Sequence, residues 1–151
     1  MLGRITSVFL STAMFVIGAH NFTGTWKLDT AKSKYVDMAK PKEMTVTYTP
    51  EGSGWRYEAK GTREDGQPIN SSFIYVKDNE EIKTSGFPLW DTVVLKNAQG
   101  DVATGTFKRD GKIVGNVKRT LSADDKIMTL TVTVTTPEGK KAHYTSVYIR
   151  Q

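Results

Sequence analysis

The feature that most constrains the fold of this chain is a strict alternation of apolar side chains and threonines from Met128 to Thr135. Successive side chains of a β-strand point to opposite faces of the sheet, so this pattern predicts a strand with one buried face. Threonine also favours strands, because its branched Cβ packs well on a pleated surface. Residues 44–49 repeat the pattern, and neither stretch has the period of a helix.

Short turn sequences divide the rest of the chain at regular intervals. Asp65-Gly66 and Asp110-Gly111 are typical of tight hairpins, because both residue types tolerate positive φ angles. The interval from Gly52 to Gly66 is 14 residues and that from Gly100 to Gly111 is 11. Such spacing leaves little room for crossover helices and predicts successive antiparallel hairpins. The strands are expected at 22–28, 43–50, 54–61, 69–77, 80–84, 91–97, 101–109, 112–121, 126–136 and 140–150.

A sheet of antiparallel strands must protect two edges, and closure into an up-and-down barrel removes both. A two-sheet sandwich is the alternative, but it usually needs longer crossing connections than these tight turns. We therefore predict an all-β, antiparallel, up-and-down barrel of about eight to ten strands, a size that can enclose one small ligand.

Residues 29–42 depart from the alternation of strand and turn. Asp29 or Thr30 would cap one helical turn, and Pro41 would end it. We expect one short helical or irregular segment here, after the first strand. A lid or plug at the barrel mouth and a solvated loop are the two alternatives for it.

The first 19 residues differ from the remainder. A basic opening with Arg4 precedes an uncharged, mainly apolar stretch, 5–18, and the small residues Gly18 and Ala19 end it. This order is typical of a secretory signal peptide. We predict a signal peptide at 1–19, a barrel domain at 20–151, and export to the periplasm or the medium. An uncleaved membrane anchor is the alternative, although the apolar stretch is shorter than the roughly 20 residues that a span needs.

Composition excludes several kinds of chemistry. The chain has no cysteine, which removes disulfides, thiolate nucleophiles and thiolate metal sites. The formal net charge is +5, and the basic residues at 32, 34, 40 and 42 are accompanied by one aromatic residue, Tyr35, whereas nucleic-acid surfaces use a denser basic stripe with several stacking aromatic residues. We expect no metal, no cofactor, no nucleic-acid partner and no transmembrane segment after residue 19.

The segment Gly24-Thr25-Trp26 resembles the start of the first strand in lipocalins. That resemblance implies that Gly24 and Trp26 belong to a motif at the closed end of the barrel, with Arg150 or Arg119 lying across the Trp26 ring. A closer resemblance, to small exported bacterial lipocalin-like proteins, rests on residues 31–35, 91–93, 119–124, 128–129 and 147–148. It implies a barrel and export, and it implies no particular activity.

Aromatic residues supply the candidate ligand site. Trp55 and Tyr57 alternate with charged residues, which predicts that both rings point inward. Tyr75, Tyr144 and Tyr148 occupy similar strand positions, and tyrosines inside a barrel combine apolar walls with hydroxyl groups, as small-molecule cavities do. The alternative is that these rings only fill the core.

Arg119 shares a strand face with the apolar residues Val117 and Leu121, so it would enter the barrel. A buried guanidinium needs a carboxylate, an anionic ligand or an aromatic face. The alternative is a position at the rim or on the Trp26 ring. We count Arg119 among the candidate ligand-binding residues.

Two further features bear on function. The connection 85–90 is apolar, and it would either form an exposed lip or fold back over the barrel end. His143 is the one histidine within the expected strands, and no catalytic residue is assigned. The sequence therefore predicts a barrel that binds a small apolar or anionic molecule. The alternatives are a scaffold with a filled interior and, third, a hydrolase or isomerase.

Overall fold

In the computed structural model, residues 22–151 are described and form one ten-stranded antiparallel sheet. The expected signal peptide lies outside the described residues. Residues 22–151 contain no helical segment with the length and hydrophobicity of a membrane span. The strands are β1 (Gly24–Val36), β2 (Pro41–Glu51), β3 (Gly54–Arg63), β4 (Pro68–Tyr75), β5 (Glu81–Lys83), β6 (Thr92–Lys96), β7 (Val102–Arg109), β8 (Lys112–Leu121), β9 (Ile127–Thr135) and β10 (Lys141–Arg150).

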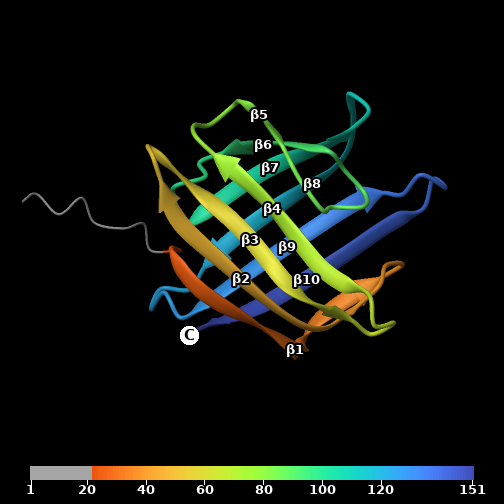
Figure 1. Cartoon of the computed structure of the whole chain (residues 1–151), viewed down its shortest axis with the longest axis horizontal. Coiled ribbons are helices and arrows are strands. Elements are labelled where there is room, and N and C mark those ends of the chain that lie inside the picture. Colours follow the sequence, from red (N-terminus) through yellow and green to blue (C-terminus); the bar gives the residue numbers. More distant parts are fainter. Residues whose placement is uncertain (1–21) are drawn as a thin grey trace, which may run out of the picture.

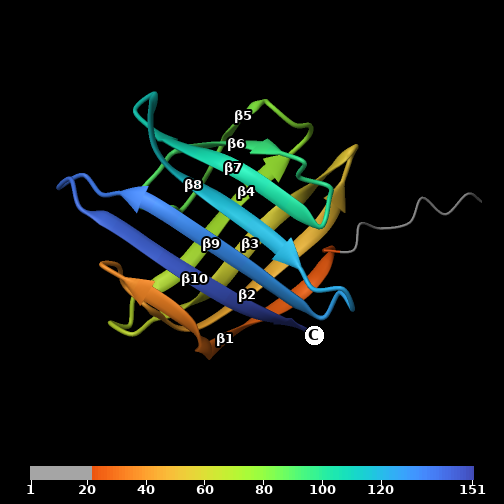
Figure 2. The same cartoon turned by 180° about the vertical axis from the view of Figure 1, so that it is seen from behind.

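The sheet closes into an up-and-down barrel, which confirms the predicted fold class. Strands that are consecutive in sequence pair with each other, except β4 and β5, and β1 also pairs with β10. Strands β1–β4 form one side of the barrel and β7–β10 the opposite side (Figures 1 and 2). The gap between β4 and β5 is bounded by an isolated bridge from Ser72 of β4 to Ser85, which follows β5.

Of the two forms expected for segment 29–42, helical or irregular, the structure has the irregular one. Strand β1 continues to Val36, and its pairing with β10 shifts register between Asp29 and Lys34. The Asp29 carboxylate accepts the backbone N–H groups of Ala31 and Lys32, each at 3.1 Å. No helical turn forms in residues 29–42. The capping carboxylate instead shapes an irregularity within a strand, because pairing to β10 satisfies more backbone groups than one isolated turn would.

One end of the barrel is closed around Trp26, which is fully buried. Its indole Nε1 donates to the Phe22 carbonyl at 2.8 Å. The Arg150 guanidinium lies 4.3 Å from the Trp26 ring centroid and donates to the carbonyls of Thr23 and Asp125, each at 2.7 Å. Of the two basic residues that the lipocalin resemblance allows, the structure places Arg150 over the tryptophan.

Replacing Trp26 by alanine removes the largest ring at the closed end and leaves a cavity there. We expect Trp26→Ala to lower the free energy of unfolding by about 3–5 kcal/mol, as large-to-small changes of buried aromatic residues do. Urea denaturation followed by circular dichroism measures this loss. Thr131→Val on the exposed face of β9 is the control and should change stability by less than about 0.5 kcal/mol. An equal effect of the two substitutions would contradict the role given to Trp26.

Candidate functional site: a divided cavity inside the barrel

The barrel interior contains two adjoining cavities. The inner chamber, of about 70 Å³, lies between Trp55, Arg119 and the interior side chains of β6–β9. The outer chamber, of about 360 Å³, opens at the other end of the barrel beside Tyr35, Met38 and Met44. The chambers adjoin, because five residues line both: Tyr57, Phe87, Trp90, Leu130 and Tyr144.

Strands β3 and β4 build the aromatic wall of the inner chamber. Alternation turns Trp55 and Tyr57 of β3 inward, and the register places Tyr75 and Phe73 of β4 beside them. The rings stack in pairs, with centroids 4.8 Å apart for Trp55 and Tyr75 and 4.9 Å apart for Tyr57 and Phe73. Stacked rings of this kind are held in place by their neighbours, so the wall is rigid and mainly apolar.

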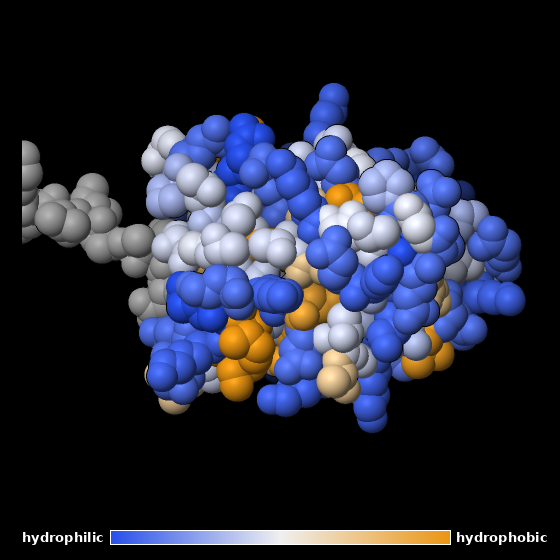
Figure 3. Space-filling view, turned by 60° about the horizontal axis from the view of Figure 1, so that its bottom comes forward, coloured by the Kyte–Doolittle hydropathy of each residue, from blue (hydrophilic) through white to orange (hydrophobic). Residues whose placement is uncertain are grey.

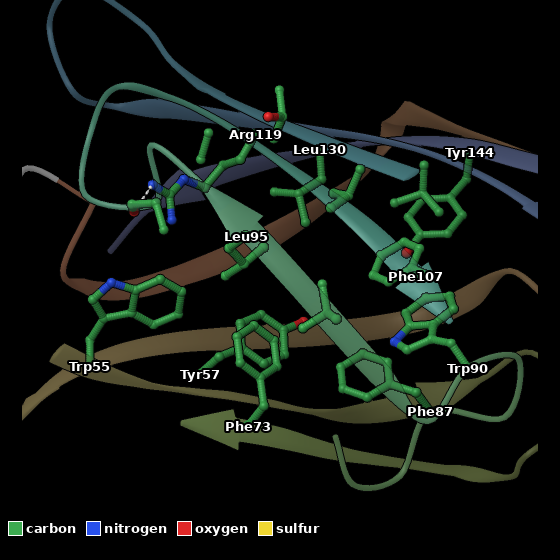
Figure 4. Close-up of a pocket in the computed structure, with 16 residues that line it drawn as sticks. Trp55, Tyr57, Phe73, Phe87, Trp90, Leu95, Phe107, Arg119, Leu130 and Tyr144 are labelled. Carbon is green, nitrogen blue, oxygen red and sulfur yellow. Dashed lines mark hydrogen bonds between the residues drawn. The ribbon is translucent and has the colours of Figure 1, made fainter. Parts of the chain in front are cut away.

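The apolar connection 85–90 folds back over the open end, which was one of its two expected forms. Trp90 is buried, and its ring stacks on Phe107 with centroids 3.9 Å apart. Phe87 stacks on Trp90 at 5.0 Å. Figure 4 shows Trp55 and Arg119 at one end of the inner chamber, with Phe87, Trp90 and Tyr144 at the other.

Arg119 enters the barrel from β8 and is 5% exposed. Its Nη2 donates to the carbonyls of Ala98 and Gly100, at 2.8 and 3.1 Å. The guanidinium carbon lies 3.9 Å from the ring centroid of Phe22. Among residues 22–151, no carboxylate forms an ion pair with this guanidinium. The cation is therefore held by backbone carbonyls and an aromatic face, which leaves its positive charge without a neutralising partner.

Two buried hydrogen-bond donors at this end of the barrel lack acceptors within the described part of the chain: the Arg119 Nε–H and the Trp55 Nε1–H. Both residues line the inner chamber, and the guanidinium carbon of Arg119 is 5.9 Å from the Trp55 ring centroid. A buried donor without an acceptor is destabilising. The inner end of the cavity is thus a place where an acceptor or anion would be stabilised.

The outer chamber carries tyrosine hydroxyls on apolar walls. The Tyr35 hydroxyl lies 2.6 Å from Ser146 Oγ, and the Tyr35 ring stacks on Tyr144 at 5.3 Å. Burial raises the pKa of the Tyr57 and Tyr148 hydroxyls well above the usual value. These hydroxyls stay neutral at physiological pH, so they can give or accept hydrogen bonds without adding charge.

Most of the expected site residues meet at these cavities. Trp55 and Arg119 line the inner chamber, Tyr148 lines the outer one, and Tyr57 and Tyr144 line both. Tyr75 lines neither, because it is buried behind Trp55 and its hydroxyl donates to Asp78. Their role in ligand binding stays a prediction.

Some residues around the cavities were not anticipated from the sequence. Phe107 alternates with polar neighbours on β7, so the period-two pattern contained its signal. Phe22 had no such signal, since its contact with Arg119 joins residues far apart in the chain. His143 is exposed on β10, outside both cavities.

Asp78 supports the inner end of the site from the β4–β5 connection. Its carboxylate accepts the Tyr75 hydroxyl at 2.9 Å and the backbone N–H groups of Asn97 and Ala98 at 2.8 and 3.1 Å. Burial acts to raise the pKa of Asp78, but these hydrogen bonds outweigh it and lower the pKa from its usual 3.8. Asp78 thus fixes the turn whose Ala98 carbonyl accepts from Arg119.

No protein-family model and no curated protein sequence matches this chain. Among solved structures, it is similar to zebrafish ileal bile acid-binding protein complexed with cholic acid. The two are 11% identical over 87% of this chain and 99% of that chain, with a TM-score of 0.51. A redesigned β-barrel, mFAP1, bound to DFHBI is 18% identical over 86% and 95% of the two chains, with a TM-score of 0.47. The likeness to the zebrafish protein supports the barrel fold.

Asp78 makes the stability of the barrel depend on acid pH. Its pKa is lower in the folded than in the unfolded chain, so its contribution is present above about pH 4 and is lost as the pH falls through the folded-state pKa. We expect the difference in free energy of unfolding between the wild type and Asp78→Asn to be constant from about pH 7 to 5 and to shrink below about pH 4. Urea denaturation over this range measures it. A difference that does not change with pH would contradict the assignment.

Proposed function

We propose that this protein binds a small, mainly apolar molecule inside the barrel and holds an anionic or hydrogen-bond-accepting group of that molecule at Arg119 and Trp55. The observation that carries this proposal is a pair of adjoining, mainly apolar chambers whose inner end presents two buried donors with no acceptor among residues 22–151. Hydrogen bonds to a charged partner are about twice as strong as neutral ones, so an anion would gain most from these donors.

The size of the cavity supports binding rather than a purely structural interior. The outer chamber alone, at about 360 Å³, falls in the range of roughly 300–1,000 Å³ that small-molecule sites occupy. A barrel that served only as a scaffold would fill this space with side chains, since protein interiors are closely packed. The zebrafish protein that shares the fold is complexed with cholic acid.

On the face drawn in Figure 3, the outer surface shows no large apolar patch that would suggest a docking site in place of binding in the interior. Hydrophobic residues there form separate patches within a mainly hydrophilic surface. A dedicated protein-docking surface usually presents a contiguous apolar patch of several hundred Å². The interior therefore supports a function better than that face does.

Loss of the Arg119 charge tests the proposed orientation of the ligand. Dodecanoate and its neutral analogue dodecanol are titrated calorimetrically into the wild type and Arg119→Gln. We expect the substitution to weaken dodecanoate binding by about 10- to 100-fold, as the loss of a charged hydrogen bond does, and to change dodecanol binding little.

Lys118→Gln is the matched control, because Lys118 precedes Arg119 on β8 and is exposed. It removes the same charge from the outside of the barrel and should leave both affinities unchanged. Equal effects of the two substitutions on dodecanoate would reject Arg119 as the anchor. Failure of the wild type to bind either compound would reject interior binding of such molecules.

We also propose that the protein is exported, on the order of charged, apolar and small residues in 1–19. Mass spectrometry of the protein isolated from its host should then find a chain that begins at His20. Ala19→Asp places a charge at the predicted cleavage site and should leave the longer chain. A protein recovered from the cytosol at its full length would contradict export.

A further inference from the structure

Phe87 lies where the two chambers join. It lines both of them, and its ring centroid is 5.0 Å from that of Trp90 and 6.0 Å from that of Tyr57. A third ring, Phe73, has its centroid at 6.3 Å. The Phe87 side chain therefore lies at the boundary between the outer chamber and the inner chamber that Arg119 lines.

The backbone that carries Phe87 is held on one side by β4. Ser85 and Ser72 exchange two backbone hydrogen bonds, each of 2.9 Å. Gly86 has φ of +78°, and a Cβ there would lie only 2.0 Å from the Asn70 carbonyl oxygen. The chain thus passes so close to β4 that only glycine fits.

The other side of the same connection is held by β7. Arg109 donates from Nη1 to the Leu89 carbonyl at 2.8 Å, and the Asp91 N–H donates to the Lys108 carbonyl at 2.9 Å. Displacing the connection as a lid would break these hydrogen bonds together with those to β4. Rotation of one side chain within a fixed connection breaks none of them.

Phe87 differs from the other residues at the junction in where it is attached and how deeply it is buried. Tyr57, Leu130 and Tyr144 project from paired strands. Trp90 is 7% exposed and stacks directly on Phe107. Phe87 is only partly buried and lies in the connection between β5 and β6. Among the rings of Tyr57, Phe87, Trp90 and Tyr144, it is the one that is both partly buried and outside the paired strands.

We propose that the Phe87 ring is the gate between the outer and inner chambers, and that it determines the shape of ligand that reaches Arg119. This inference rests on the proposed interior binding. Because the surrounding wall is fixed, rotation of the ring opens a narrow passage rather than a wide one. The preferred ligand is therefore a linear amphiphile whose unbranched segment lies beside Phe87, whereas a bulky polycyclic acid stays in the outer chamber.

Hydrogen exchange of the Trp55 indole tests the gate without any ligand. The Trp55 Nε1–H has no acceptor among residues 22–151, so its exchange depends on the access of water to the inner chamber. We expect Phe87→Ala to accelerate this exchange at least tenfold, measured by NMR in D₂O. Leu89→Ala is the control, because Leu89 belongs to the same connection but lines only the outer chamber.

The Trp26 indole is an internal reference for general loosening of the barrel, since it is bonded to the Phe22 carbonyl and lines neither chamber. Faster exchange at Trp55 with unchanged exchange at Trp26 supports the gate. Phe87→Leu keeps more bulk, so it should accelerate the exchange less than Phe87→Ala does. It replaces the alanine variant in the test if that variant does not fold. Wild-type exchange at Trp55 in the Phe87 variants, or equal acceleration in Leu89→Ala, would overturn the proposal.

A pair of acids tests the consequence for ligand shape. Phe87→Ala should raise the affinity for adamantane carboxylate at least tenfold while changing that for dodecanoate much less, by calorimetry. Equal changes for the two acids would overturn the shape filter. Absence of binding by every variant, together with the accelerated Trp55 exchange, would reject the proposed function and leave the gate supported.

Discussion

The pairing of β1 with β10 is the contact on which the rest of the structure depends. It joins the first and last strands of the described chain, and without it the ten-stranded sheet would divide into two separate sheets, β1–β4 and β5–β10, with no shared interior. The stacking of Arg150 on Trp26 lies at the end of this pairing, where the carbonyls of Thr23 and Asp125 also accept from the guanidinium. One side chain of the last strand therefore ties together the start of β1 and the β8–β9 turn.

Closure has a consequence at the opposite edge of the sheet. Strands β4 and β5 do not pair with each other; an isolated bridge instead joins Ser72 of β4 to Ser85 in the β5–β6 connection, which passes over the mouth of the barrel. Phe87, Leu89 and Trp90 thus cover apolar surface that a fully paired sheet would have enclosed. Phe87 and Trp90 also lie between the two chambers, so the incomplete closure of the sheet contributes to the shape of the interior.

The placement of Arg119 is unfavourable by itself. A buried cation loses its hydration, and two carbonyl acceptors with an aromatic face replace only part of it. The aromatic residues around it give a stable core that can tolerate such a group, and Asp78 fixes the turn that supplies one of the carbonyls. Destabilising features of this kind concentrate where proteins bind other molecules.

Much of the architecture follows from local pattern. The alternation at 128–135 and the turn residues at 65–66 and 110–111 determined the strands, their antiparallel order and the all-β class, because strand period and hairpin geometry are properties of neighbouring residues. The same alternation turned Trp55 and Tyr57 inward. Alternation also predicted that Arg119 points into the barrel, but it did not predict which residues contact the guanidinium there.

Only the tertiary structure decided the contacts between residues distant in the chain. The local sequence predicts that Asp29 caps a helical turn, yet pairing with β10 makes its carboxylate part of a strand irregularity. Arg150, rather than Arg119, lies on Trp26, and Phe22 meets Arg119 instead. The division of the cavity by Phe87 likewise depends on how β4, β7 and the β5–β6 connection converge. Side-chain period specifies which face a residue occupies, whereas barrel closure determines which residues share the interior.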